Sequence, residues 1–334
     1  MKIAFFETED WEIPILKQGL NGNEGIFYKG ALTNENVAKA KDADVVSVFI
    51  YSKLNKDLLR KLPKLKYITT RSMGTDHIDL EACKKAKIKA SNAPHYGDNS
   101  VAEHAFGLIL AISRNIHKAY LRAVNKNYSI EGLMGFDLKG KTLGVIGTGR
   151  IGSHVIKIAS GFEMNILAYD CKANKELIKK YGCKYVALDN LLKESDIVTL
   201  HVPYCKENHH LIGKKEIASM KPSAVLINTS RGPIVDTAAV LRALKSEKLA
   251  GLGIDVVEGE ELIKEEKELL HEAYRINLKK MRELAVDHEL LNNEKVVFTP
   301  HIAFYSQEAV KRILDVTIEN INAFAKGKPI NLIC

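Results

Sequence analysis

Short apolar runs alternate with segments of helical spacing along most of the chain. In the first hundred residues, the apolar runs predict buried strands and the intervening good helix formers predict helices. The expected strands are 3–6, 45–48, 67–70 and 88–90, and the expected helices are 34–40, 56–62 and 80–86. Strands that alternate with helices build parallel sheets with helices on their faces. This half therefore predicts a small doubly wound α/β domain.

The same alternation returns after residue 141 and outlines a second sheet. The expected strands are 142–146, 165–169, 184–186, 197–201, 224–228 and 252–256, and the expected helices are 150–160, 175–181, 214–220 and 237–248. Before this half lies a helical pattern over 99–124 whose apolar positions surround the axis, which predicts one buried helix between domains or subunits.

The pattern changes after residue 258. Residues 259–295 are rich in charge and predict a helical, polar excursion on the surface, which could also cover a cleft or a partner subunit. A strand at 296–298 and an amphipathic helix over 306–325 follow.

The strand expected at 142–146 leads into three glycines with G-x-G-x-x-G spacing. Gly147 permits the tight turn, Gly149 lets a pyrophosphate approach the backbone, and Gly152 lets the following helix pack closely. Asp170 ends the next strand, where a carboxylate accepts hydrogen bonds from the ribose hydroxyls of NAD and repels the 2′-phosphate of NADP. We therefore expect NAD as cofactor.

Composition and charge narrow the class of protein. A chain of 334 residues suggests about two domains, and no apolar run approaches a membrane span. The net charge of +8 is spread among interleaved acids and bases, which favours a solvated surface over nucleic-acid binding. Five scattered cysteines without a C-x-x-C pair, and an acidic N-terminus unlike a secretory signal, lead us to expect a cytoplasmic protein.

Two polar residues follow expected strands at the edge where open α/β sheets bind ligands. Arg231 follows strand 224–228, and an arginine there can hold a carboxylate by two charge-assisted hydrogen bonds. His301 follows strand 296–298 and can exchange the proton of a carbonyl/hydroxyl pair. Glu260 is the candidate carboxylate partner that would raise the pKa of this histidine.

Taken together, these residues resemble the D-isomer-specific 2-hydroxyacid dehydrogenases, particularly the D-lactate dehydrogenase branch, over essentially the whole chain. The motifs that carry the resemblance are Gly147-Thr148-Gly149-Arg150-Ile151-Gly152, His201-Val202-Pro203, Asn228-Thr229-Ser230-Arg231-Gly232, Gly253-Ile254-Asp255-Val256-Val257-Glu258-Gly259-Glu260 and Thr299-Pro300-His301-Ile302-Ala303-Phe304-Tyr305.

The resemblance implies two doubly wound parallel-sheet (Rossmann/flavodoxin-like) domains, with the NAD-binding domain (99–298) inserted in a substrate domain (1–98 and 299–334). It implies reversible NADH-dependent reduction of a small 2-oxo acid, with pyruvate the first choice. Arg231, Glu260 and His301 would be catalytic. The implied cofactor residues are Gly147, Thr148, Gly149, Arg150, Ile151, Gly152, Asp170, Val202, Pro203, Asn208, Thr229 and Asp255. The implied substrate residues are Met73, Gly74, Tyr96, Arg231, Phe304 and Tyr51, with the backbone N–H groups of Met73 and Gly74 completing the anion site.

Alternatives remain at this point. The pocket residues do not separate pyruvate from branched 2-oxo acids, as in a D-hydroxyisocaproate-type enzyme, and a non-catalytic NAD(H)-sensing protein is a further alternative. A homodimer built on the 99–124 helix is expected, with no nucleic-acid or membrane partner. His201, His209 and His210 could suggest a metal, but no carboxylate or cysteine cluster adjoins them, so no metal is expected.

Overall fold

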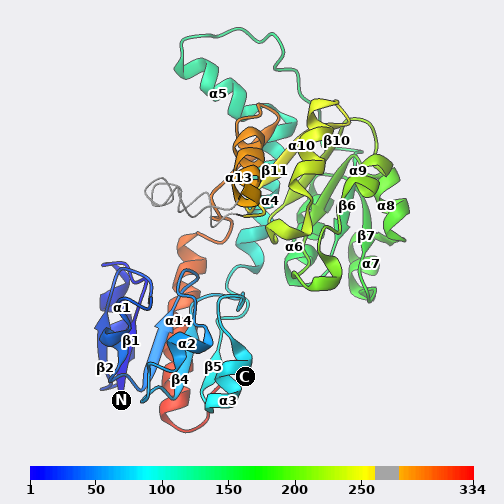
Figure 1. Ribbon diagram of the computed structural model, residues 1–334. Coiled ribbons are helices and arrows are strands. Elements are labelled where there is room, and N and C mark those ends of the chain that lie inside the picture. Colours follow the sequence, from blue (N-terminus) through cyan, green and yellow to red (C-terminus); the bar gives the residue numbers. More distant parts are fainter. Residues whose placement is uncertain (260–277) are drawn as a thin grey trace. The chain divides into compact units, whose positions relative to one another are not determined.

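The structure is a computed structural model that describes residues 1–259 and 278–334 (Figure 1). Within it the chain forms two compact units. Unit 1 comprises residues 1–96 and 305–334, and unit 2 comprises residues 97–304. The chain therefore leaves unit 1, builds unit 2 and returns for its last helix.

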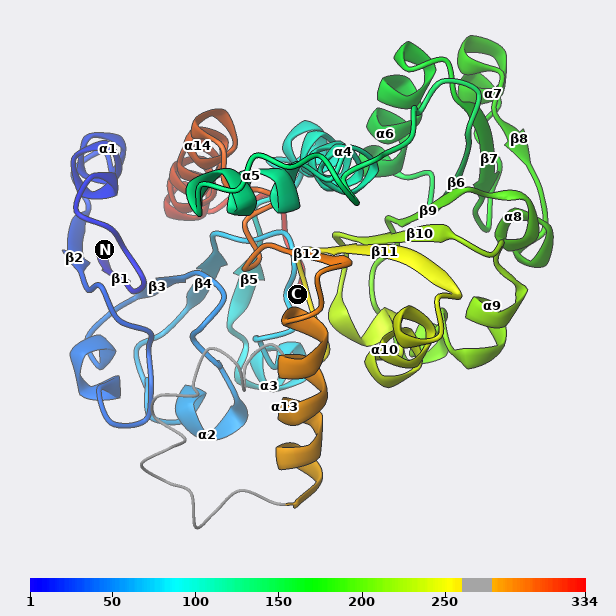
Figure 2. The ribbon, with the colours of Figure 1, turned by 90° about the horizontal axis from the view of Figure 1, so that it is seen from above.

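Unit 1 is a five-stranded parallel sheet in the order β2-β1-β3-β4-β5. Its strands are β1 (Lys2–Phe5), β2 (Glu24–Phe27), β3 (Val45–Val48), β4 (Tyr67–Thr70) and β5 (Lys89–Ser91). Its helices are α1 (Glu12–Gly19), the 3₁₀ helix η1 (Val37–Ala40), α2 (Lys56–Leu59), α3 (Leu80–Ala86) and α14 (Gln307–Ala325). Leu16 of α1 and Leu314 of α14 pack on one face, and Leu58 of α2 packs on the other (Figure 2).

Unit 2 is a seven-stranded parallel sheet in the order β12-β11-β10-β9-β6-β7-β8. Its strands are β6 (Thr142–Ile146), β7 (Asn165–Tyr169), β8 (Lys184–Tyr185), β9 (Ile197–Leu200), β10 (Ala224–Asn228), β11 (Leu249–Ile254) and β12 (Val296–Phe298). The helices are α4 (Asp98–Ser113), α5 (Ile116–Val124), α6 (Arg150–Gly161), α7 (Lys175–Tyr181), α8 (Leu188–Glu194), η2 (Lys206–Asn208), α9 (Lys214–Ser219), η3 (Gly232–Ile234), α10 (Thr237–Lys245) and α13 (Leu278–Leu291). Helices α4 and α6 cover one face of the sheet, and α9 and α10 cover the other (Figure 2).

These sheets confirm the predicted fold class of two doubly wound α/β domains. The order of unit 1 is the flavodoxin-like one, and unit 2 has the dinucleotide-binding order extended by β12. In unit 2 the strand order reverses between β6 and β9, and such a reversal opens a crevice at the carboxyl ends of the strands.

Some local predictions were wrong. Helix α1 and strand β2 were missed, because the polar residues around them hide the pattern. The predicted 99–124 helix is two helices, since Asn115 adopts a left-handed φ of 50° between α4 and α5. The expectation of burial holds for α4 but fails for α5, which buries none of its residues.

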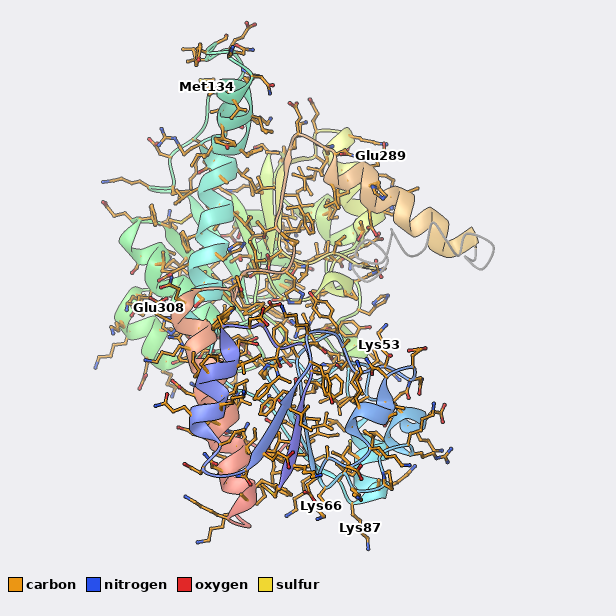
Figure 3. All side chains as sticks on the ribbon, turned by 90° about the vertical axis from the view of Figure 1, so that its left-hand side faces the viewer. Lys53, Lys66, Lys87, Met134, Glu289 and Glu308 are labelled. Carbon is orange, nitrogen blue, oxygen red and sulfur yellow. The ribbon has the colours of Figure 1, made fainter. Side chains whose placement is uncertain are left out.

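Helix α5 and the following residues to 134 form an arm that extends from unit 2 (Figures 1 and 3). Hydrogen bonds at the base of the arm hold its two ends together: the side-chain Nδ2 of Asn115 donates to the carbonyls of Leu133 and Met134, and Phe136 N donates to Ser113 O at 2.8 Å. Met134, labelled at the far end of the arm in Figure 3, is 93% exposed. The arm thus has a defined path and an exposed apolar surface.

No helix in the described part of the chain is both long enough and apolar enough to span a membrane.

Candidate functional site

The glycine loop after β6 has the shape that a pyrophosphate site requires. Gly147 has φ +90°, and a Cβ placed on it would lie 2.5 Å from the carbonyl oxygen of His201. A Cβ on Gly152 would overlap the carbonyl oxygen of Gly147, which explains the close packing of α6. At Gly149 a Cβ would meet nothing within 4 Å, so the backbone faces open space there. The residues present therefore fit a dinucleotide.

Two buried polar atoms on the loops after β9 and β10 have no hydrogen-bond partner within the described residues. They are Nδ1 of His201 and Oγ1 of Thr229. Thr229 was expected to contact the cofactor, and the loop of His201 lies directly against Gly147. Orphaned buried polar atoms are rare in folded proteins. At a strand-order reversal they fit a site that completes its hydrogen bonds with a ligand.

The loop after β9 contains the other residues expected to line the cofactor. Asn208 Nδ2 donates to Pro203 O at 2.6 Å, and Asn208 Oδ1 accepts from Cys205 N at 2.8 Å. These bonds close the loop into a compact turn next to Val202.

Asp170 lies after β7, as the ribose-binding interpretation requires. Its Oδ2 accepts hydrogen bonds from the backbone N–H of Thr148 at 2.7 Å and from Thr148 Oγ1 at 3.0 Å. Burial opposes ionisation of Asp170, but the hydrogen bonds from Thr148, Lys172 and Cys171 outweigh it and lower the pKa of the carboxyl. The side chain is therefore anionic at neutral pH and is held against the glycine loop.

Arg231 follows β10 in a loop with a defined backbone. Asn228 Nδ2 donates to Arg231 O at 3.0 Å, and Asn228 Oδ1 accepts from Ser230 N at 3.0 Å. The guanidinium Nη1 donates to Ser230 O at 2.7 Å, and the residue is partly exposed. The loop thus presents a guanidinium at the carboxyl end of the sheet.

His301 follows β12 and has a left-handed φ of 56°. This conformation is uncommon for residues other than glycine and must be stabilised by its surroundings. The carboxylate of Asp255 supplies the stabilisation, because it accepts hydrogen bonds from Ile302 N at 2.9 Å and from Ala303 N at 2.8 Å. His301 N also donates to Asp255 O at 2.9 Å.

Asp255 is 1% exposed, and its carboxylate faces the loop that follows β12. Thr299 Oγ1 donates to Asp255 Oδ1, and Thr299 in turn lies 2.8 Å from Nε2 of His104 on α4. Burial lowers the pKa of His104, and the nearby Asp255 partly offsets this. Asp255, Thr299 and His104 thus form a hydrogen-bonded group behind the His301 loop.

In unit 1, two side-chain hydrogen bonds hold the loop after β4. Asn92 Nδ2 donates to Met73 O at 2.8 Å, and Ser72 Oγ donates to Gly74 O at 2.7 Å. Among the described residues, the N–H groups of Met73 and Gly74 have no hydrogen-bond partner. Adjacent unpaired N–H groups form anion-binding sites.

Arg71, the first residue of this loop, is a structural residue. It is 2% exposed and donates to Phe6 O, Glu7 O and Ser47 Oγ. The carboxylate of Glu7 accepts the backbone N–H of Tyr51 at 3.1 Å. The Arg71 side chain therefore joins the ends of β1, β3 and β4.

The remaining predicted pocket residues differ in burial. In unit 1, Tyr96 is buried and its carbonyl accepts from Arg312 Nε at 2.8 Å, whereas Tyr51 is 55% exposed. In unit 2, Phe304 is partly buried beside Gly97. Glu260, the predicted partner of His301, lies outside the described residues.

Comparison with known proteins identifies the family. Residues 106–303 match the family model of the D-isomer specific 2-hydroxyacid dehydrogenase, NAD binding domain. The chain belongs to this family. D-lactate dehydrogenase of Escherichia coli is 36% identical, with 98% of each chain aligned. The match covers nearly the whole chain, so membership extends over both units of the dehydrogenase.

Solved structures support the same assignment. D-lactate dehydrogenase of Aquifex aeolicus, complexed with NAD and lactic acid, has a TM-score of 0.86 and 39% identity over 98% of this chain and 96% of that one. A D-2-hydroxyisocaproate dehydrogenase structure has a TM-score of 0.84 and 32% identity over 100% of this chain and 99% of that one. The dehydrogenase therefore shares its fold and its NAD-binding domain with enzymes of differing substrates.

Sequence reasoning missed three contacts: that of His104 with Thr299, that of Asp255 with Ala303, and those of the buried Arg71 guanidinium within unit 1. His104 lies on a helix that precedes the glycine motif, so nothing in the pattern linked it to Thr299. For Arg71, the signal available was its position directly after a buried apolar strand.

Proposed function

We propose that this dehydrogenase reduces pyruvate to D-lactate with NADH, reversibly. In this proposal, residues 99–298 form the NAD-binding domain, and residues 1–98 and 299–334 form the substrate domain. Bound NADH supplies the hydride that adds to C2 of the 2-oxo acid. The chain's own residues bind and orient the acid and deliver a proton.

The roles follow from the chemistry of the side chains. Arg231 of unit 2 binds the substrate carboxylate by two parallel hydrogen bonds. In unit 1, the N–H groups of Met73 and Gly74 are the proposed anion-binding groups. His301 donates its proton to the carbonyl oxygen, and in the reverse direction accepts it. Glu260 is the proposed carboxylate partner of the His301 imidazole.

Residues of the fingerprint and of the neighbouring loops hold the cofactor. The turn from Gly147 to Gly152, which includes Thr148, Arg150 and Ile151, binds the pyrophosphate, and Asp170 binds the ribose hydroxyls. Further contacts come from the loops after β9 and β10, where the orphaned Thr229 hydroxyl is an available hydrogen-bonding group. The backbone of Asp255 adjoins this edge, while its side chain positions His301.

The observation that carries the proposal is the order of loops along one sheet edge. Arg231 follows β10 and His301 follows β12, and both strands pair with β11, which leads into Asp255. An anion-binding guanidinium and an acid/base group at one edge provide what reduction of a 2-oxo acid needs. A binding protein that only senses NAD(H) has no use for this pair.

An assay of NADH oxidation with several 2-oxo acids tests the proposal. We expect the highest kcat/KM with pyruvate, a D-configured product, and a KM raised at least about tenfold in Arg231→Lys, because an ammonium cannot replace the planar fork. Preference for 2-oxoisocaproate would favour the branched-acid alternative. NADH binding without turnover of any acid would favour the sensing protein.

We also propose that two copies of the chain form a homodimer through the arm of unit 2. On α5, Ile116, Tyr120, Leu121 and Val124 are each more than half exposed. A contiguous apolar patch of this kind marks a protein interface. A second copy of the chain fits this patch, because hydrogen bonds at the base of the arm already hold its path and little ordering remains on association.

Light scattering at micromolar concentration tests the dimer. The wild type should have twice the mass of one chain, and Leu121→Glu with Val124→Glu should shift the mass towards that of the monomer. Ile178→Glu, on the surface of α7, is the matched control and should remain dimeric. A monomeric wild type would rule the dimer out.

A cytoplasmic location is part of the same proposal. All five cysteines are free, and two of them, Cys171 and Cys205, are exposed. Exposed free thiols persist in reducing compartments.

A further inference from the structure

A histidine pair and a carboxylate that are distant in the sequence meet in unit 2. His209 and His210 lie in the loop after β9, and Glu258 lies after β11. Nε2 of His210 is 3.1 Å from both carboxylate oxygens of Glu258. One ligand atom from each of the three residues lies within 4.8 Å of the others.

The backbone on both sides of this cluster is fixed by contacts that do not involve the three side chains. His210 N donates to Pro233 O at 2.9 Å, and Ile212 N donates to Ile234 O at 3.1 Å. Gly232 lies against the backbone of Val257 and Glu258, where an added Cβ would overlap it. The backbone contacts between the loops after β9, β10 and β11 thus hold the three side chains near one another.

The surroundings of His209 leave one ring nitrogen for a ligand. The hydroxyl of Tyr204 lies 3.5 Å from Nδ1 of His209. The rings of His209 and His210 stack with centroids 3.9 Å apart and an angle of 22° between their planes. A polar partner on the second nitrogen of an imidazole fixes the tautomer and ring orientation at metal sites.

We propose that His209, His210 and Glu258 bind one Zn²⁺ ion. Two imidazoles and a carboxylate are a donor set that zinc uses with a fourth, water ligand. The sequence predicted no metal because no carboxylate adjoins the histidine pair, but the fold brings in Glu258 from 48 residues away. His201, also considered from the sequence, is outside this group, and its Nε2 lies 2.8 Å from Thr199 Oγ1.

None of the three proposed ligands is a proposed catalytic residue, and Glu258 lies two residues before Glu260 in the sequence. A bound ion would join the loop after β9, which includes the expected cofactor residue Asn208, to the segment after β11. It would replace the His210–Glu258 hydrogen bond by coordination. The ion would coordinate both imidazoles in their neutral form.

Calorimetric titration of the full-length apo chain with Zn²⁺ alone tests the proposal. We expect one equivalent of tight binding in the wild type, and at least about tenfold weaker binding in His209→Gln and in Glu258→Gln. Co²⁺ in the same site should give the intense visible absorption of a four-coordinate ion. His209 is exposed, so its substitution should leave the fold and the NADH oxidation rate intact.

Two controls separate this site from other zinc ligands. His154→Gln replaces a single histidine on α6, and Cys205→Ser removes the exposed thiol of the same loop; both should bind zinc like the wild type. Equal zinc affinity in His209→Gln and the wild type would overturn the proposal. The proposal would also be overturned if Cys205→Ser lost the tight zinc equivalent while His209→Gln and Glu258→Gln kept it.

Discussion

The carboxylate of Asp255 accepts a hydrogen bond from the backbone N–H of Ala303 at 2.8 Å. This contact, with the neighbouring one to Ile302, holds the turn in which His301 takes its left-handed φ. Asp255 therefore acts on the proposed proton donor through the backbone, from the end of an adjacent strand.

Asp255→Asn should lower kcat by about 10²-fold, because the amide cannot accept all the hydrogen bonds that the carboxylate accepts and the imidazole loses its position. NADH binding, followed by fluorescence titration, should change far less than kcat. A kcat equal to that of the wild type would mean that the turn does not depend on Asp255.

His301→Ala should lower kcat by about 10²–10⁴-fold, the usual contribution of a general acid. The affinity for NADH should be retained, since the cofactor residues are unchanged. His154→Ala serves as the control and should keep full activity. Near-normal turnover in His301→Ala would remove this residue from the mechanism.

Asp170→Asn should weaken NADH binding by about tenfold or more, because a hydrogen-bond acceptor for the ribose loses its charge. It should also improve the use of NADPH, since the charge that repels a 2′-phosphate is gone. The ratio of kcat/KM for the two cofactors measures the effect, with the exposed Asp189→Asn as control. An unchanged ratio would contradict the assignment.

The free energy of unfolding should depend on pH because of the His201 side chain. Burial lowers the pKa of this histidine from 6.5 to about 3, so the native state keeps it neutral where the unfolded chain takes up a proton. Above about pH 6.5 this histidine leaves the free energy of unfolding unchanged. As the pH falls from there towards 3, protonation of the unfolded chain lowers the free energy of unfolding by at most about 1.4 kcal/mol per pH unit.

His201→Asn removes this titration. Urea unfolding should show that the stability advantage of the wild type over the variant shrinks by up to about 2 kcal/mol between about pH 7.5 and pH 5. If the difference between the two proteins were constant over this range, His201 would titrate normally in the folded state.

Arg71→Met should destabilise unit 1 by about 3 kcal/mol, because it leaves the buried carbonyl of Phe6 and the part-buried carbonyl of Glu7 without their donor. Arg71→Lys should not restore stability, since an ammonium cannot span the same acceptors. Arg60→Met is the matched control at the C-cap of α2, where the ion pair with Asp57 is exposed and the change should be within about 0.5 kcal/mol. Equal effects at the two positions would contradict a role for the buried guanidinium.

Local patterns were enough to predict most strands, the glycine loop and the order of Arg231 and His301. Each of these depends on residues close together in the chain: an apolar run makes the strand, and the strand's end sets the position of the next polar residue. The confirmed fold class follows from this alternation, because helices between parallel strands must pack on the sheet. The motifs were also sufficient to recognise the family.

Contacts between distant residues could be decided only by the folded chain. Nothing near Asp255 in the sequence indicates that its carboxylate holds residues 302 and 303, and nothing near His210 indicates Glu258. The same holds for the break at Asn115, where a single left-handed residue turns α5 outward and exposes its apolar side chains. The periodicity of apolar residues in the sequence indicates which face of a helix or strand is apolar. The packing of the loops and helices determines what each polar or apolar group meets, and it depends on the whole fold.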